Sequence, residues 1–298
     1  MTTHTDQYQC DSCDNARHFA TVVPSLAFHE PMVFYGIFAL AGRYEELRTQ
    51  SSDDLESTYY HNKCLELLIE ALSEPPDTYG VPLLTAVVLS RLYEEYKVDQ
   101  DTYFHHLSGT RNLLTYNAIT RSAQQGGLAE AACWIHLHQA IYVSLVHSRQ
   151  PIDLDLIVFE SFSSLQQKSG HFFVNRSVYL LAKVIQVFFS GKKSIQEKDT
   201  KMGDLETELE DWWNTIPRSF SPLREDPADI PGGRPFPRIW MLSSVQAMAV
   251  EYYYASQILL CLHRSEAGMS RASSGFEAAR IRRANEVCAP NQFTSVPC

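Results

Sequence analysis

Two cysteines near the start of the chain have the spacing of a metal-binding or redox pair. Cys10 and Cys13 form C-x-x-C within the stretch YQCDSCDNARHF. A structural zinc site needs four converging ligands, usually from a second such pair, and a redox dithiol usually follows a strand. The next cysteine is Cys64, in an amphipathic segment, and the nearest histidines, His4 and His18, have unsuitable spacing. We therefore predict no metal site and no redox centre at this pair.

Histidines provide the second candidate chemistry, which is general acid–base catalysis or metal ligation. They occur in pairs, at 105 and 106 and at 136 and 138, with a further one at 147. Residues two apart on a helix point about 200° apart, so His136 and His138 cannot converge on one ion. His105 and His106 also diverge. We expect these histidines to make local hydrogen bonds in the core or at the surface.

Sequence signatures of common enzymes do not occur in the 298 residues. The chain has no G-x-S-x-G elbow, no phosphate-binding loop, no dinucleotide-binding glycine pattern and no H-E-x-x-H. Aromatic runs, WW at 212–213 and YYY at 252–254, could line an apolar pocket, although in helical proteins such side chains usually pack in the core. The sequence therefore predicts no cofactor and contains no catalytic motif.

The charge of the chain argues against direct contact with nucleic acid. Its formal net charge is −10, and basic residues are concentrated only at Lys192 and Lys193 and in RIRR, 280–283. An acidic surface repels phosphate backbones. Seven scattered cysteines make no disulfide framework, and neither a long apolar run nor a signal-peptide pattern is found. We expect an intracellular protein that binds neither nucleic acid nor membrane by itself.

The elements that must position these residues are predicted to be helices. Apolar residues recur at intervals of three and four, strand patterns are scarce, and prolines mark the joints. The predicted fold class is therefore all-α, a multi-helix orthogonal or antiparallel bundle. Expected helices cover about 31–47, 53–73, 81–96, 102–119, 128–150, 175–189, 204–216 and 240–263. The proline-rich stretch 217–237 is predicted to be a long irregular loop, a candidate lid or crossing between lobes.

The first two helices carry apolar residues that we expect to face the core. On the first helix these are Val33, Ile37, Leu40, Ala41 and Tyr44. The second carries Leu55, Tyr59, Leu65, Leu68, Ile69 and Leu72. The acidic stretch SSDDLES before the second helix is expected to cap it.

Several blocks, in their order and content, resemble the regulatory, or middle-homology, region of fungal zinc-cluster transcription factors. They include CDNARHFATVVPSLAFHEPMVFYGIFALAGR, AACWIHLHQAIYVSLVHSRQP and FPRIWMLSSVQAMAVEYYYASQILLCLH, and together they cover about residues 8–288. The resemblance implies an all-α regulatory domain at 14–288, an N-terminal extension at 1–13 and an irregular tail at 289–298. In the family this domain follows a six-cysteine cluster that holds two zinc ions and binds DNA. That cysteine spacing is not present in this sequence.

One block departs from the family pattern. Where the resemblance leads us to expect W-I-x-L-R-Q-D-I-Y, this chain has His138 and Ala140 in place of the arginine and the aspartate. An internal ion pair that the resemblance implies is therefore replaced by two uncharged residues.

The resemblance implies a stand-alone regulatory-domain protein. We expect a transcription-related regulator that senses a small apolar molecule, or pairs with a protein partner or a second copy, without binding DNA. It is expected in the nucleus, with the cytoplasm as the alternative.

The competing hypothesis is an enzyme built on the same helical scaffold. It would be of the cyclase or isomerase type in fungal secondary metabolism, and would orient a reactive apolar substrate without a metal or nucleotide cofactor. The regulator is favoured, because no catalytic motif is present. For the enzyme, the residues expected to line the pocket are His138, Tyr142, His136, His106 and Trp134.

Overall fold

The computed structural model describes residues 11–51, 53–96, 116–152, 154–166, 170–191, 195–230, 232–234, 236–266 and 293–295. The chain forms two compact units. The first unit comprises Met1–Leu137 and Glu160–Ser163, and the second comprises His138–Phe159 and Ser164–Cys298.

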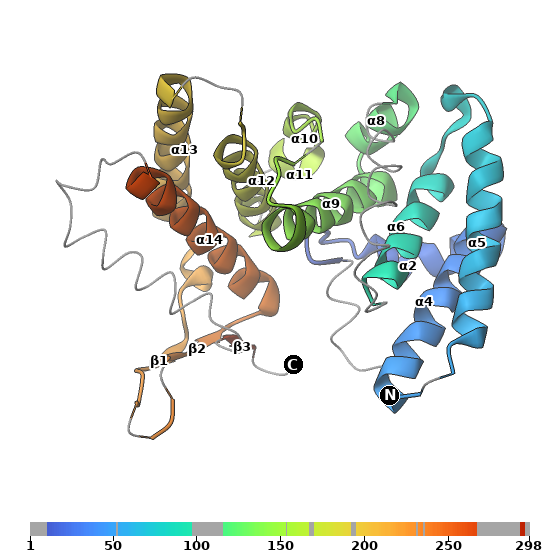
Figure 1. Ribbon diagram of the computed structural model, residues 1–298, viewed down its shortest axis with the longest axis horizontal. Helices are drawn as coiled ribbons and strands as arrows, with labels where there is room; N and C mark the ends of the chain where they lie inside the picture. Colours follow the sequence, from blue (N-terminus) through green and yellow to red (C-terminus); the bar gives the residue numbers. More distant parts are fainter. Residues whose placement is uncertain are drawn as a thin grey trace. The chain divides into compact units, whose positions relative to one another are not determined.

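The first unit is built from helices around a central buried one. Its elements are α2 (His18–Thr21), α3 (Val23–Leu26), α4 (Pro31–Thr49), α5 (Leu55–Ser73), a 3-10 turn (Pro76–Thr78), α6 (Val81–Glu95), α8 (Asn117–Gln124) and most of α9 (Gly127–Tyr142) (Figure 1). Proline stands in the first turn of α3, α4 and α6, where its missing N–H costs no hydrogen bond. Every residue of α6 from 83 to 93 is buried, so α6 is the core of this unit.

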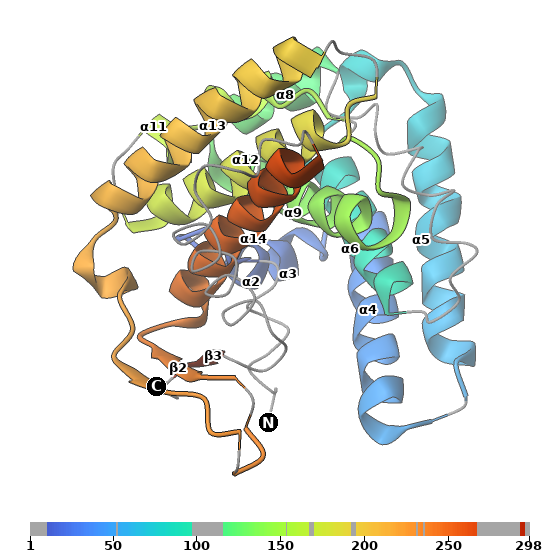
Figure 2. The same cartoon turned by 60° about the vertical axis from the view of Figure 1, so that its left-hand side comes forward.

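Helices α4 and α5 lie side by side, as Figures 1 and 2 both show, and both pack against α6. Their close approach depends on glycine. A Cβ added at Gly36 would lie 3.2 Å from the side chain of Leu89, and one at Gly42 would lie 3.1 Å from Cβ of Ser57. Small residues therefore allow these backbones to come together without displacing a neighbour.

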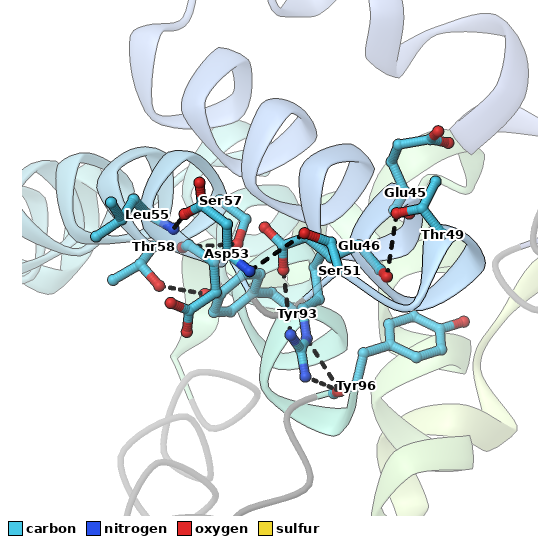
Figure 3. A network of polar contacts seen from close by, with 12 residues as sticks. Glu45, Glu46, Thr49, Ser51, Asp53, Leu55, Ser57, Thr58, Tyr93 and Tyr96 are labelled. Atoms are coloured by element: carbon cyan, nitrogen blue, oxygen red, sulfur yellow. Dashed lines mark hydrogen bonds and ion pairs between the residues drawn. The ribbon is translucent and has the colours of Figure 1, made fainter.

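The turn between α4 and α5 is held by its own polar groups (Figure 3). Thr49 Oγ1 donates to the carbonyl of Glu45 at 2.7 Å, and Ser51 Oγ accepts from the N–H of Asp53 at 3.2 Å. The Asp53 carboxylate in turn accepts from the N–H of Leu55 at 3.2 Å, at the first residue of α5. The acidic stretch before this helix therefore satisfies the N–H of its first residue through Asp53, whereas the N-cap residue Asp54 makes no capping hydrogen bond with its side chain.

The second unit packs α12 against α13 and α14. Its elements are a π-helical turn (Val143–Ser148), α12 (Gly170–Phe188), α13 (Ile195–Thr215), a 3-10 turn (Arg218–Phe220), β1 (Arg224–Asp226), β2 (Arg238–Met241), α14 (Ser244–Glu266) and β3 (Phe293–Ser295). The short helices α10 (Ile157–Glu160) and α11 (Ser163–Gln166) lie where the chain passes between the units. Between α13 and α14, the ring of Tyr253 stacks on Trp212 and Trp213 at centroid distances of 5.6 and 4.5 Å.

A small three-stranded sheet completes the second unit. Its order is β1-β2-β3, with β1 antiparallel to β2 (Arg224 opposite Trp240) and β3 parallel to β2 (Ile239 opposite Phe293). The described part of the chain is otherwise almost entirely helical, which confirms the predicted all-α class.

Two predictions near this sheet need correction. The stretch 217–237 was expected to be irregular, and most of its described residues are, but it also contains β1 and a bridge between Asp229 and Arg234. The last long helix was expected from residue 240, but it begins at Ser244 because Ile239 and Met241 alternate into the core as a strand. Ser243 Oγ then accepts from the N–H of Gln246 at 3.3 Å and marks the start of the helix.

The buried faces of α4 and α5 also differ from those predicted. Leu55, Tyr59 and Ile69 are 76%, 54% and 66% exposed, and Ala41 of α4 is exposed as well. The residues of α5 that face the core are Ser57, His61, Cys64 and Leu68. Short side chains fit the close contact with α4, and hydrogen bonds satisfy the polar ones, so the larger apolar residues turn outward. The predicted helix at 102–119 lies almost entirely outside the described residues, as does RIRR.

Candidate functional site

Helix α9 carries four of the five side chains proposed for a pocket, and two of them lie in the first unit. His136 is buried against Arg91, whose guanidinium approaches Nδ1 of the imidazole. Burial and this guanidinium hold the pKa of His136 well below its ordinary value, so the ring is neutral. Trp134 is buried, and its indole N–H donates to Glu130 at 3.4 Å, while Glu130 accepts from Ser163 at 2.7 Å.

The other two lie in the second unit. Nδ1 of His138 is 2.9 Å from the hydroxyl of Tyr252 on α14, and the two ring centroids are 5.5 Å apart. Burial lowers the pKa of His138 to about 4, so its neutral ring can accept the phenol proton in a hydrogen bond. Tyr142 is 50% exposed. The fifth residue, His106, lies outside the described residues.

Two polar residues of the second unit were not singled out from the sequence. Gln139 is 4% exposed, and neither the oxygen nor the nitrogen of its side-chain amide has a hydrogen-bond partner among the described residues. Glu251, next to Tyr252, is half-buried, and burial raises its pKa to about 7. Both are polar residues within strongly apolar helical stretches, LHQAI and AVEYYY, which is the signal that could have revealed them.

A histidine, a serine and a glutamate also meet in the core of the first unit. His61 Nε2 lies 2.9 Å from Ser90 Oγ and 3.6 Å from a carboxylate oxygen of Glu94, and its ring stacks on Tyr93 at 4.1 Å. In a nucleophilic triad the carboxylate orients the ring through one nitrogen while the other takes the serine proton. Here both groups approach the same nitrogen, so the arrangement ties α5 to α6 and is not a relay.

The N-terminal cysteine region also makes structural contacts. The Asp11 carboxylate accepts from the backbone N–H groups of Phe19 and Ala20 at 3.0 and 3.1 Å. Cys13 is buried, and burial raises the pKa of its thiol, which disfavours the thiolate that a metal requires. Cys10 lies outside the described residues. Within the part of the chain that the structure describes, no three His, Cys, Asp or Glu side chains gather as a metal site would require.

The outward face of α4 and α5 is aromatic. Phe34 and Phe38 of α4 are 39% and 43% exposed, and their rings lie 4.6 Å apart. Phe38 contacts Tyr60 of α5 at 5.3 Å, and Tyr60 contacts Tyr59 at 5.5 Å. We call this face the α4–α5 surface; its exposed apolar members are Phe34, Phe38, Leu55, Tyr59 and Ile69.

None of the described helices combines the length and apolar character needed to cross a bilayer.

The fold defines the class of the protein as an all-α domain, and its described part has buried polar clusters and an exposed aromatic face. The chain belongs to the family described as the fungal specific transcription factor domain, whose model matches residues 7–274. This match confirms the resemblance seen in the sequence, and it supports a regulatory-domain role. Neither the curated proteins nor the solved structures gave a match to this chain.

Proposed function

We propose that this chain is a transcription-related regulator that acts by pairing with another copy of the same helical domain and does not itself contact DNA. The family supports the regulatory role. The observation that supports the pairing is the α4–α5 surface. Exposure of several large apolar side chains to water is unfavourable unless a partner covers them.

The size of this surface suits a protein partner. On α5, Leu55, Tyr59 and Ile69 are exposed and lie within one side of the helix, and on α4 Phe34 and Phe38 are partly exposed. At roughly 200 Å² for a fully exposed large side chain, these five residues offer on the order of 500 Å². A standard interface covers about 800 Å² on each partner, so this surface with its polar rim is large enough for a dimer.

Charge favours a second copy as the occupant. The chain has a net charge of −10, so most encounters between two copies are repulsive. The α4–α5 surface differs because it carries charges of both signs: Arg48, near the end of α4, pairs with Glu45 at 2.8 Å, and Lys63, in the middle of α5, pairs with Glu66 at 2.7 Å. In a two-fold interface the same patch of each copy meets the other, so mixed charges can face opposite signs across it.

Co-purification of two differently tagged copies tests the pairing. We expect the wild-type copies to be recovered together from one culture, and the double variant Phe38→Ser with Tyr59→Ser to lose this association. Ile230→Ser is the matched control, since Ile230 is 75% exposed but lies in the second unit. Equal recovery of the double variant and the control would contradict pairing through this surface.

The DNA part of the proposal has its own test. Because the sequence is acidic and contains no six-cysteine cluster, the purified chain should give no sequence-specific gel shift with a library of random duplexes at moderate salt. Selection of a defined DNA sequence by the chain alone would overturn this part. A fluorescently tagged chain should lie in the nucleus; a uniform cytoplasmic signal would favour the alternative location.

The enzyme remains a second candidate because of one observation, the contact between the neutral His138 and Tyr252. A phenol hydrogen-bonded to a neutral imidazole can give or take a proton during an isomerisation or cyclisation. His138, Tyr142, His136, His106 and Trp134 are its proposed pocket residues. Turnover of a polyene or quinone substrate that Tyr252→Phe abolishes, and that the Phe38→Ser, Tyr59→Ser variant retains, would favour this function over the regulator.

A further inference from the structure

The side chain of Gln139 is the buried polar group that the described structure leaves most incompletely bonded. It lies on α9 in the second unit with 4% of its surface exposed, and both atoms of its amide end lack a partner among the described residues. A primary amide offers two N–H donors and a carbonyl acceptor. Leaving all of these unmet inside a protein is strongly unfavourable, so a group other than the described residues is expected there.

The residues next to Gln139 along the chain either already form a hydrogen bond with another group or have no polar side-chain atom. His138 is bonded to Tyr252, and Ala140 has no polar side-chain atom. One turn further along, Val143 is apolar and buried, and the Ser144 hydroxyl donates to the carbonyl of Gln150. None of these four residues of α9 and the turn after it gives the amide a hydrogen-bond partner in the structure.

We propose that Gln139 is the anchor of a small-molecule site in the second unit, and that its ligand is a neutral, mainly apolar molecule carrying a cis-amide or lactam group. Such a group presents one donor beside one acceptor, which pairs with the side-chain amide through two hydrogen bonds. The inference goes beyond the pairing function and stands on different residues.

The chemical class follows from the surroundings. A charged ligand would lose its hydration at this buried position, and the uncharged amide of Gln139 offers no opposite charge to replace it. An apolar ligand with no polar group would leave the amide unmet. A mainly apolar molecule with a single neutral donor–acceptor pair avoids both penalties, and this composition is typical of small-molecule sites in proteins.

Ligand-observed NMR titration of the full chain tests the site with 2-pyrrolidone as the probe. The comparison compounds are N-methyl-2-pyrrolidone, which lacks the donor, and butyrate, which is charged. We expect 2-pyrrolidone to bind with a dissociation constant of about a few millimolar, as suits so small a molecule. Both comparison compounds should bind at least tenfold more weakly.

Two variants complete the experiment. Gln139→Leu should weaken 2-pyrrolidone binding at least tenfold without lowering the melting temperature, because it removes an unmet amide and keeps the volume filled. Gln257→Leu, at the buried glutamine of α14, should bind the probe within twofold of the wild type.

Three outcomes would overturn the proposal. The first is equal binding of 2-pyrrolidone and its N-methyl analogue, which would mean that the Gln139 amide forms no hydrogen bond with the N–H of the ligand. The second is unchanged binding by Gln139→Leu. The third is no binding of any probe together with a lowered melting temperature for Gln139→Leu, which would mean that ordered water already satisfies the amide. Each leaves the pairing tests unaffected.

Discussion

Burial changes the protonation of single residues on α9 and α14 in opposite directions. His138 has its pKa lowered to about 4, and Glu251 has its pKa raised to about 7. Both shifts have the same cause, because burial removes water from the group and so disfavours its charged form. At neutral pH His138 is therefore uncharged, while Glu251 is close to half protonated.

The variant Glu251→Gln should reveal the raised pKa of Glu251 as a change in how stability depends on pH. Between pH 4.5 and 7 the folded wild type retains a proton that the unfolded chain releases, so Glu251 makes the free energy of unfolding fall as pH rises through this interval. The variant lacks this effect and should be more stable by about 1–2 kcal/mol at pH 8 and by almost nothing at pH 4.

Urea unfolding of both proteins at several pH values measures this difference. His138 acts in the opposite sense between pH 4 and 6.5, but it is present in both proteins and cancels from the comparison. Glu70→Gln, at an exposed position of α5, is the control and should match the wild type at every pH. A difference that does not grow with pH would show that Glu251 is not the titrating group.

At the scale of elements, α4 is tied to the end of α6 by one arginine. The Arg43 guanidinium donates to the carbonyl of Tyr96 at 3.0 and 3.1 Å and to the carboxylate of Glu46 at 3.1 Å. Glu46 is buried, so this pair is largely shielded from water. It satisfies the carbonyl of the C-cap residue of α6, at the end of the helix where backbone carbonyls need partners from outside it.

Arg43→Met should lower the free energy of unfolding by about 2–4 kcal/mol, because it leaves a carboxylate buried without its cation. Arg48→Met removes an ion pair to Glu45 that is exposed, and should leave the free energy of unfolding almost unchanged. Chemical denaturation of the two variants makes the comparison. Equal losses would mean that the Arg43 contacts do not stabilise the helix pair.

Two neighbouring tryptophans on α13 provide a second matched pair of substitutions, one at a buried and one at a partly exposed position. Trp212 is 3% exposed and donates its indole N–H to the carbonyl of Phe173 on α12 at 2.8 Å, whereas Trp213 is 38% exposed. Trp212→Ala should cost about 3–5 kcal/mol of stability and Trp213→Ala about 1 kcal/mol. Thermal unfolding that ranks the two variants in the reverse order would contradict this packing.

The sequence predicted the ends of helices well where prolines mark them. It predicted poorly which side of a helix is buried, because that depends on packing against other helices. Pro31 and the prolines after Ser73 bound α4 and α5 as expected. Periodicity alone placed Leu55 and Ile69 in the core, but close contact with α4 selected Ser57 and Cys64 instead. Such choices depend on which helix lies opposite, which local patterns do not contain.

For the site, the sequence named His138 but not its partner. Tyr252 lies 114 residues further along the chain, and only the fold brings the two together. Gln139 could be read as a polar residue in an apolar helix, but its unmet amide depends on three-dimensional neighbours. The strand at Trp240 was missed because three or four alternating residues before a helix resemble the helix itself.

At the scale of the whole molecule, two features in separate units give a regulatory domain its proposed means of action. The first unit carries the α4–α5 surface for a second copy, and the second unit carries Gln139 for a small ligand. Neither feature needs contact with DNA, which agrees with the net charge of −10. Because the two sets of residues are distinct, each can be changed without altering the other.

Sedimentation velocity of the purified chain tests the central claim, pairing through the α4–α5 surface, most directly. The chain has a mass of 33.9 kDa. We predict that, as the protein concentration rises, the sedimenting mass of the wild type and of Ile230→Ser increases from this value to twice it. The dissociation constant of the dimer should be about 10 μM. The Phe38→Ser, Tyr59→Ser variant should stay at the single-chain mass at every concentration up to about 100 μM, tenfold above that constant. A wild type that stays at the single-chain mass, or a double variant that dimerises equally well, would contradict the account.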